Sequence, residues 1–326
     1  MRYFVTGGTG FIGRRLVRRL LADGHEVRAL VRDPARAADL ERLGARLCPG
    51  DITAPETLPE PMRGADGVYH VAGWYEVGAR DTSPGYRINV EGTRNVLETM
   101  RTLGIPKGVY TSTLAVFSDT GGRVPDETYR HDGKHLSEYD RTKWIAHYEG
   151  AEPLMARGLP LVVVQPGVVY GPGDHSRIGD TLRDYLRRRL PVLVKETAFC
   201  WAHVDDTVEG HVLAMERGRP GETYIIGGEV HTLVEAIDVA ARITGVPAPK
   251  LRLPPWILRV GSILVRPLAP VLPPTYSPET LRVSAGTTYL GDDTKARRQL
   301  GFDPRPLEVG LRGTLEAEMR ALDSGP

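Results

Sequence analysis

The sequence has few cysteines and almost no net charge. Only two cysteines, Cys48 and Cys200, occur in 326 residues. Two thiols cannot build a disulfide framework or complete a zinc site, so we expect structural thiols and no bound metal. Lysine and arginine number 42 against 41 aspartates and glutamates, which leaves a formal net charge of +1. This balance gives no electrostatic reason to expect nucleic acid or an anionic membrane as a partner.

Long apolar runs are also absent. The most apolar late stretch, residues 256–271, contains Arg259, Arg266, Pro267 and Pro270. It is too short and too interrupted to span a bilayer. The amino terminus has the pattern of a strand rather than that of a signal peptide, so we expect a cytoplasmic protein. Hydrophobic residues make up 41% and charged residues 25% of the chain, which is typical of a globular protein and excludes general disorder.

Short β-type runs alternate with helical patterns through the first half of the chain. The expected strands are 3–6, 26–31, 67–72, 108–113 and 160–165, with a short further strand before Gly50, and the expected helices are 11–23, 89–103 and 139–157. Strands that alternate with helices predict an α/β fold in which a doubly wound parallel sheet is covered on both faces.

The pattern loosens after Pro166, where connections lengthen and prolines cluster at 247–274. A β-rich run at 222–226 predicts that a piece near 200–228 returns to the sheet. We therefore expect the sheet domain to comprise residues 1–165 together with this returning piece. Residues 166–199 and 229–326 would form a smaller, mostly helical substrate-binding lobe.

A glycine-rich turn joins the first strand to the first helix, with the sequence Thr6-Gly7-Gly8-Thr9-Gly10-Phe11-Ile12-Gly13. Gly7 permits a tight turn, Gly10 lets the backbone approach a pyrophosphate, and Gly13 allows close packing of helix and strand. The first turn of the helix, which holds Phe11 and Ile12, has free N–H groups. Together with the positive end of the helix dipole, these groups favour the binding of phosphate. Because a strand precedes the motif and a helix follows it, we expect a dinucleotide-binding Rossmann domain.

The end of the second strand indicates which nicotinamide nucleotide is bound. An acidic residue there would accept hydrogen bonds from the adenosine ribose, whereas this chain has Val31-Arg32-Asp33-Pro34. Arg32 can contact a 2′-phosphate, with Arg36 as a second cation, and Asp33 is placed to cap the next helix. We therefore expect NADP(H), with NAD(H) as the alternative. Asp51 and Ile52, after the short strand, would border the adenine unless they form a simple turn.

A tyrosine and a lysine stand four residues apart in Tyr139-Asp140-Arg141-Thr142-Lys143, which places both on one face of a helix. The ammonium of Lys143 favours the ionised phenol of Tyr139, so that this group can exchange a proton with a carbonyl or an alcohol. The strand 109–113 ends in hydroxyls at the carboxyl edge of the sheet, the usual ligand crevice. A hydroxyl there could hold the reacting oxygen beside Tyr139.

These segments, taken in order, resemble the extended short-chain dehydrogenases/reductases. The resemblance rests on TGGTGFIG, HVAG at 70–73, NVEGT at 89–93, YTST at 110–113, YDRTK at 139–143, PGVVYGP at 166–172 and HVDD at 203–206. It spans nearly the whole chain and is closest to the dihydroflavonol-reductase-like branch, which includes hopanoid-associated epimerase-like proteins.

The resemblance implies roles for particular residues. Thr113 would take the place of the catalytic serine, and Tyr139 and Lys143 would be the catalytic pair, with Lys143 also holding the nicotinamide ribose. Asn89 matches an asparagine of the helix behind the site, where a structural role is equally compatible. The remaining cofactor contacts implied by the resemblance are Ala72, Pro166, Val168 and Val169.

Three departures from the family pattern bear on the substrate. Leu114 and Ala115 follow Thr113 where dehydratases carry an Asp-Glu pair, so dehydration lacks its acid and base. Phe199 stands four residues before His203, where sugar-nucleotide epimerases usually have an arginine. Val168 replaces an asparagine often found in that segment. A nucleotide-sugar substrate is therefore disfavoured, although Arg177 could supply a phosphate contact.

The sequence thus favours an NADP(H)-dependent oxidoreductase that reduces a carbonyl of a small apolar or aromatic substrate, or oxidises the alcohol. An epimerase that retains its cofactor is the alternative, and a redox sensor without catalysis is disfavoured because Tyr139 and Lys143 are both present. Trp74, Tyr75, Trp201 and the segment 253–274 would wall an apolar pocket, or else form lobe core or a surface-lying helix. His203 is expected to be a structural hydrogen-bonding residue. By resemblance, a homodimer would form through helices 89–103 and 139–157.

Overall fold

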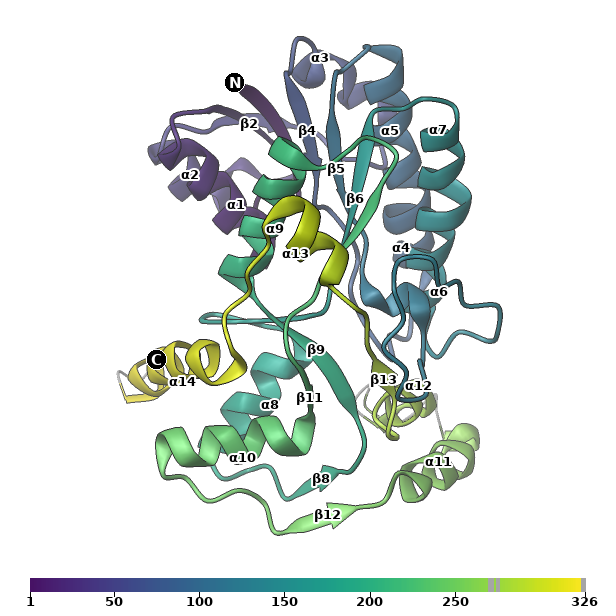
Figure 1. Cartoon of the computed structure of the whole chain (residues 1–326), viewed down its shortest axis with the longest axis vertical. Helices are drawn as coiled ribbons and strands as arrows, with labels where there is room; N and C mark the ends of the chain where they lie inside the picture. Colours follow the sequence, from purple (N-terminus) through teal and green to yellow (C-terminus); the bar gives the residue numbers. More distant parts are fainter. Residues whose placement is uncertain (269–272, 274–275, 324–326) are drawn as a thin grey trace.

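The computed structural model describes residues 1–268, 273 and 276–323. Its centre is a seven-stranded parallel sheet with the order β10-β6-β5-β4-β1-β2-β3 (Figure 1). The strands are β1 Arg2–Thr6, β2 Glu26–Val31, β3 Arg46–Pro49, β4 Gly67–His70, β5 Gly108–Thr111, β6 Leu161–Pro166 and β10 Thr223–Ile226. The expected doubly wound α/β fold is confirmed.

Helices cover both faces of this sheet, and the central strands are therefore apolar on both sides. In β6, Val162 and Val164 face one core and Leu161 and Val163 face the other. The first core is closed by α1 (Phe11–Ala22), α9 (Val204–Arg217) and α13 (Thr294–Leu300). The second core is closed mainly by α5 (Thr93–Thr102) and α7 (Glu152–Ala156), with α3 (Pro59–Met62) at its edge.

The two helices expected at 89–103 and 139–157 each contain a wide π-helical turn. The first runs through α4 (Ser83–Gly85), the π-turn η3 (Tyr86–Gly92) and α5, and the second runs through α6 (Glu138–Trp144), the π-turn η5 (Ile145–Ala151) and α7. Pro153 has no N–H to donate to the carbonyl four residues earlier, which gives η5 a local cause. The two π-turns lie against each other.

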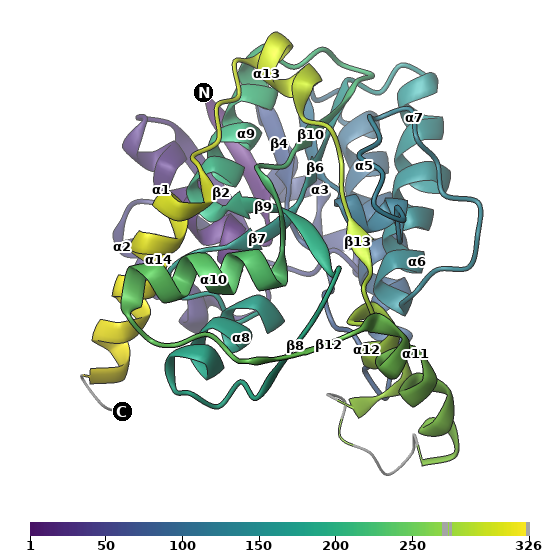
Figure 2. The same ribbon diagram turned by 60° about the horizontal axis from the view of Figure 1, so that its bottom comes forward.

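The second lobe is built on smaller sheets. In one of them β9 (Ala198–His203) pairs with β7 (Val168–Tyr170), β11 (Val230–Thr232) and β13 (Thr288–Tyr289), and in the other β8 (Val192–Val194) pairs with β12 (Leu251–Leu253). The surrounding helices are α8 Arg177–Leu186, α10 Leu233–Thr244, α11 Pro255–Leu264, α12 Pro278–Val283 and α14 Leu307–Asp323 (Figure 2). Within the described ranges, no helix is long and apolar enough to cross a membrane.

The chain passes between the two lobes more often than the sequence indicated. Residues 198–203 belong to the small sheet, and the return to the main sheet is made by α9 and β10. The late helix α13, which we expected in the substrate lobe, also returns to the main sheet. Ala296 and Leu300 of α13 pack with Val208 and Val212 of α9. Their apolar spacing alone does not reveal which lobe they cover.

Candidate active site

The glycine-rich turn lies at the carboxyl edge of the main sheet, between β1 and α1. Gly7 has φ +73°, and a Cβ there would lie 2.6 Å from the backbone nitrogen of Ala72. A Cβ on Gly13 would collide with the Gly7 carbonyl. Gly10 is the N-cap of α1 and supplies no side-chain cap, so the first N–H groups of this helix remain available to an anion. This cradle fits the pyrophosphate of a dinucleotide.

Arg32 follows β2 at the same edge and is exposed. Within the described part of the chain it has no ion-pair partner. Asp33 does not compete for a ribose, because its carboxylate accepts the Ala35 N–H at 3.0 Å and caps the following turn. The nearest downstream acid, Asp39, is engaged by Arg14 and Arg18. The end of β2 therefore presents a free cation.

The segment after β3 lies beside this cation, since the Gly50 N–H donates to the Val31 carbonyl at 3.0 Å. Asp51 folds back on its own turn and accepts the N–H and the hydroxyl of Thr53, each at 2.9 Å. Ile52 is buried and packs over Gly92. The sequence Pro166–Val169 ends β6 and begins β7 at the same sheet edge.

Tyr139 is carried by the first turn of α6. Ser137 is the N-cap of this helix, and its hydroxyl accepts the Asp140 N–H at 3.0 Å. Thr113 follows β5, where its hydroxyl accepts the Ala115 N–H at 3.1 Å and lies close enough to the Tyr139 phenol to act on its pKa. The structure therefore brings the phenol and the hydroxyl together from two elements that are separate in sequence.

Lys143, one helical turn after Tyr139, points toward β5. Its Nζ donates to the Thr111 carbonyl at 2.8 Å and to the Tyr110 hydroxyl at 3.2 Å. Burial lowers the pKa of Lys143 to about 7. Burial also raises the pKa of Tyr139 well above its usual value, against the opposing effect of the Thr113 hydrogen bond. The tyrosine is consequently a neutral phenol, the form that can donate a proton.

A buried line of polar groups connects Lys143 to the glycine-rich turn. The Tyr110 hydroxyl hydrogen-bonds with Thr93, whose Oγ1 lies 3.0 Å from Nε2 of His70. Nδ1 of His70 in turn lies 2.7 Å from the hydroxyl of Thr6. Sequence reasoning missed these contacts, although His70 and Thr93 belong to the segments HVAG and NVEGT that it singled out.

Asn89 ties the π-turn η3 to the catalytic helix. Its Oδ1 accepts the Trp74 N–H at 2.7 Å, and its Nδ2 donates to the Trp74 carbonyl and to the Thr142 hydroxyl, both at 3.0 Å. These three hydrogen bonds of Asn89 are structural. Asn89 holds the loop of Trp74 against α6, and Tyr75 of this loop contacts the Tyr139 ring edge-on at 4.8 Å.

Asp140 joins α6 to the second lobe, a contact that no sequence motif indicated. Its carboxylate accepts the Ser137 hydroxyl at 2.6 Å and the Tyr289 hydroxyl at 3.0 Å. Burial raises the pKa of Asp140 to about 7. Tyr289 belongs to β13, and its ring stacks on Phe199 with 6.2 Å between centroids. Trp201 on the same strand as Phe199 is core rather than pocket wall.

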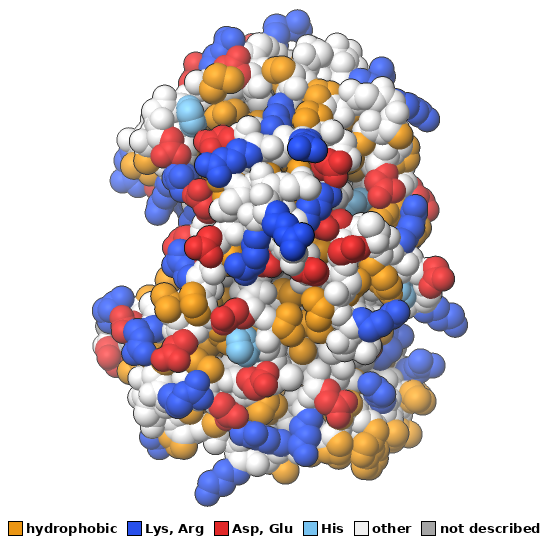
Figure 3. All heavy atoms as spheres, in the orientation of Figure 1, with side chains coloured by type: hydrophobic (Ala, Val, Ile, Leu, Met, Phe, Trp, Pro, Cys, Tyr) orange, Lys and Arg blue, Asp and Glu red, His pale blue; other side chains and the backbone are white. Residues whose placement is uncertain are grey.

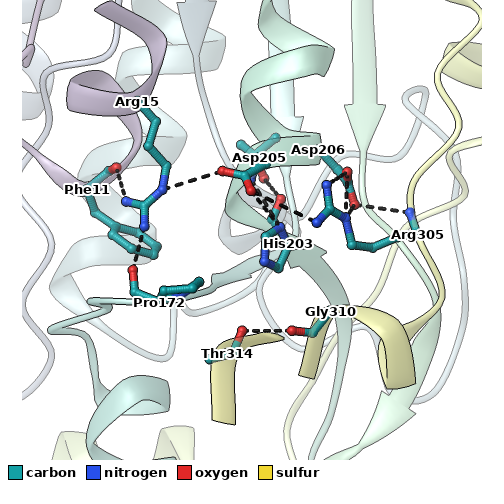
Figure 4. A network of polar contacts seen from close by, with 10 residues as sticks. Phe11, Arg15, Pro172, His203, Asp205, Asp206, Arg305, Gly310 and Thr314 are labelled. Atoms are coloured by element: carbon teal, nitrogen blue, oxygen red, sulfur yellow. Dashed lines mark hydrogen bonds and ion pairs between the residues drawn. The ribbon is translucent and has the colours of Figure 1, made fainter. Parts of the chain in front are cut away.

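The HVDD segment forms a second junction between the lobes (Figure 4). Nδ1 of His203 accepts the Asp205 N–H at 3.3 Å, which makes His203 the N-cap of α9. Asp205 lies 3.5 Å from Arg15 of α1, and Asp206 accepts hydrogen bonds from the Arg305 guanidinium at 2.7–2.9 Å and from the Arg305 backbone N–H at 3.0 Å. The expected structural role of His203 agrees with these contacts.

Comparison with known proteins places this geometry in a family. The profile of the NAD dependent epimerase/dehydratase family matches residues 3–227. A putative dihydroflavonol 4-reductase of Synechocystis sp. is 35% identical over 95% of this chain and 92% of its own. A 4-hydroxy-2-methyl-3-oxo-4-farnesyl-3,4-dihydroquinoline-1-oxide ketoreductase of Stigmatella aurantiaca is 33% identical over 94% of this chain and 92% of its own.

A solved structure agrees with these sequence relatives. The crystal structure of gox2253 matches with a TM-score of 0.84 at 32% identity, over 98% of each chain. The chain is therefore an enzyme of the NAD dependent epimerase/dehydratase family, within the extended short-chain dehydrogenases/reductases.

Proposed function

We propose that this enzyme uses NADPH to reduce a carbonyl of a small apolar or aromatic substrate, or catalyses the reverse oxidation. One observation carries the proposal. The neutral phenol of Tyr139 lies beside the Thr113 hydroxyl at the carboxyl edge of the sheet, which also holds the glycine cradle. A carbonyl oxygen between these two hydroxyls would receive a proton from one and a positioning hydrogen bond from the other.

Each residue of the site has a distinct task in this reaction. The reduced nicotinamide supplies a hydride when it is bound. Tyr139 donates its proton to the oxygen as negative charge develops there, and Thr113 fixes the position of that oxygen. Lys143 would stabilise the phenolate left on Tyr139 and would hold the nicotinamide ribose. Burial favours the protonated phenol, which supports reduction, the direction in which Tyr139 donates a proton.

The choice of NADPH is supported by Arg32, an exposed cation at the end of β2 with no ion-pair partner among the described residues. The remaining expected cofactor contacts are proposed for the backbone of Phe11, Ile12, Ala72 and Pro166–Val169, with Asp51 and Ile52 near the adenine. The two relatives named as reductases support carbonyl reduction. The Tyr75 ring beside Tyr139 and the stacked Phe199 and Tyr289 rings support an apolar substrate.

An epimerase with a retained cofactor is the second candidate, because the family includes epimerases by its description. Phe199 stands where an epimerase would have a phosphate-binding arginine, and its ring stacks on that of Tyr289. A diphosphate gains no cation there, which favours the reductase.

The test is the nucleotide content of the purified enzyme, released by denaturation and identified by chromatography, followed by titration with NADPH and NADH. The reductase predicts an empty protein that binds NADPH more tightly and oxidises it when an apolar ketone is added. Stoichiometric NAD that does not exchange would contradict the proposal and favour the epimerase.

A further inference from the structure

Helix α11 presents an apolar face to solvent. Trp256, Val260, Ile263 and Leu264 follow the spacing i, i+4, i+7 and i+8, so they share one side of the helix. Trp256 is 62% and Leu264 70% exposed. Figure 3 shows hydrophobic side chains gathered at the lower right, where Figure 1 places α11. Such a contiguous face marks an interaction site.

The segment of the chain that carries this face has charged residues of one sign. No aspartate or glutamate occurs between Asp238 and Glu279. Arg259 and Arg266 border the apolar side chains and are exposed, and in the described part of the chain neither is paired with a carboxylate. The net charge of +1 hides this local excess of cations. We call Trp256, Val260, Ile263 and Leu264, with these two arginines, the α11 surface.

We propose that the α11 surface docks on an anionic phospholipid bilayer. Helices that lie in the headgroup region combine an apolar face with flanking cations, and tryptophan prefers that boundary. The cations would contact lipid phosphates while the apolar side chains enter the acyl boundary. A second copy of this chain fits less well, because a two-fold interface at this surface would place arginines against arginines.

Docking at this surface would bring the catalytic helix close to the bilayer. Helix α11 packs on α12, and a carboxylate oxygen of Glu279 in α12 accepts the Glu138 N–H at 3.2 Å. Glu138 is the first residue of α6 and directly precedes Tyr139. The inference goes beyond the proposed reduction and does not depend on it, because lipid binding is measured without turnover.

The test is co-sedimentation of the full chain with vesicles of phosphatidylcholine, with and without phosphatidylglycerol. We expect binding to the anionic vesicles and little binding to phosphatidylcholine alone. Trp256 emission should shift to shorter wavelength on binding, and the shift should disappear in Trp256→Phe. Equal binding to both kinds of vesicle, or none, would overturn the proposal.

Paired substitutions separate the apolar and the cationic contributions of the α11 surface to lipid binding. Ile263→Gln with Leu264→Gln should lower the partition coefficient by about tenfold or more. Leu43→Gln with Val309→Gln, at two other exposed apolar positions, should not. Arg259→Gln with Arg266→Gln should lower it about fivefold for each arginine, against Arg219→Gln with Arg298→Gln as the control. Thermal unfolding verifies the fold of each variant. The parent protein could instead form a concentration-dependent dimer and bind no lipid. If Ile263→Gln with Leu264→Gln abolished that dimer, the result would favour a second copy of the chain and reject the bilayer.

Discussion

At the scale of the residue, the site depends on ionisable groups that are removed from water. Tyr139 is held as a neutral phenol by burial, and Lys143 has its pKa lowered to about 7 for the same reason. Thr113 supplies the hydrogen bond that opposes the shift on Tyr139. The positions of these three side chains, rather than their intrinsic acidities, determine which of them can exchange a proton with a substrate.

Tyr139→Phe removes only the hydroxyl that we propose as the proton donor. We expect kcat with an apolar ketone to fall by about a hundredfold or more, while the Kd for NADPH changes little. Tyr86→Phe, on the exposed side of η3, is the matched control and should retain full activity. A variant that loses NADPH binding together with turnover would show that Tyr139 holds the cofactor instead.

Arg32→Gln removes the cation at the end of β2. Because charge-assisted hydrogen bonds contribute about 1.5–3 kcal/mol, the Kd for NADPH should rise by about tenfold or more while that for NADH stays nearly constant. Arg46→Gln, an exposed arginine at the start of β3, controls for general charge. Fluorescence titration with both nucleotides measures the ratio of the two Kd values. An equal loss of affinity for NADPH and NADH would show that Arg32 does not contact the 2′-phosphate.

Residues four apart on one helix could be paired from the sequence, because helical periodicity fixes their relative direction. Tyr139 and Lys143 are such a pair. The contacts among Tyr110, Thr93 and His70 join three different elements, so no local spacing reveals them. The hydrogen bond between Asp140 and Tyr289 spans even more of the sequence and depends on where the second lobe closes.

At the scale of the element, apolar strands were predicted well because each is bounded by turn residues and buried on both faces. β4 and β5 end two residues earlier than expected, at His70 and Thr111, because the chain leaves the sheet there to form the site. The π-turns were not predicted, since their residues remain compatible with ordinary helix.

Ser137→Ala removes the N-cap of α6 and one hydrogen bond to Asp140. The free energy of unfolding should fall by about 1 kcal/mol, and kcat should fall as well, because Tyr139 occupies the first turn that the cap orders. Thr232→Ala removes the cap of α10, far from the site, and should cost similar stability with no effect on kcat. Denaturant unfolding and steady-state kinetics measure both. Equal kinetics in the two variants would argue against a link between cap and catalysis.

At the scale of the whole molecule, the lobes are joined by contacts of two kinds. Arg305 and Asp206 form a partly exposed ion pair, which contributes little on its own. Asp140 and Tyr289 form a buried hydrogen bond. Because the carboxyl pKa is raised to about 7 in the folded protein from about 3.9 when unfolded, folding takes up a proton between these values.

It follows that the stability contribution of Asp140 is fully present below about pH 4 and is lost as pH rises toward 7. Asp140→Asn cannot ionise and should lack this loss. Relative to the parent protein, the variant should therefore gain at least about 1 kcal/mol between pH 5 and pH 8. Urea unfolding at both pH values measures the difference, with Asp303→Asn, an exposed aspartate, as the control. If the difference in unfolding free energy between Asp140→Asn and the parent protein were the same at both pH values, the raised pKa of Asp140 would be contradicted.

The protonation of the buried Lys143 amine also makes nucleotide binding depend on pH. With a pKa of about 7, it is only partly protonated in the empty protein near neutrality, and the negative charge of a bound nicotinamide nucleotide would favour its protonated form. Cofactor binding thus becomes a proton-consuming equilibrium, whose affinity falls as pH rises above 7. Calorimetry in two buffers of different ionisation enthalpy should report this uptake for the parent protein and not for Lys143→Met, whereas equal heats for the parent would contradict it. A more alkaline medium would accordingly loosen the hold of this enzyme on its nucleotide.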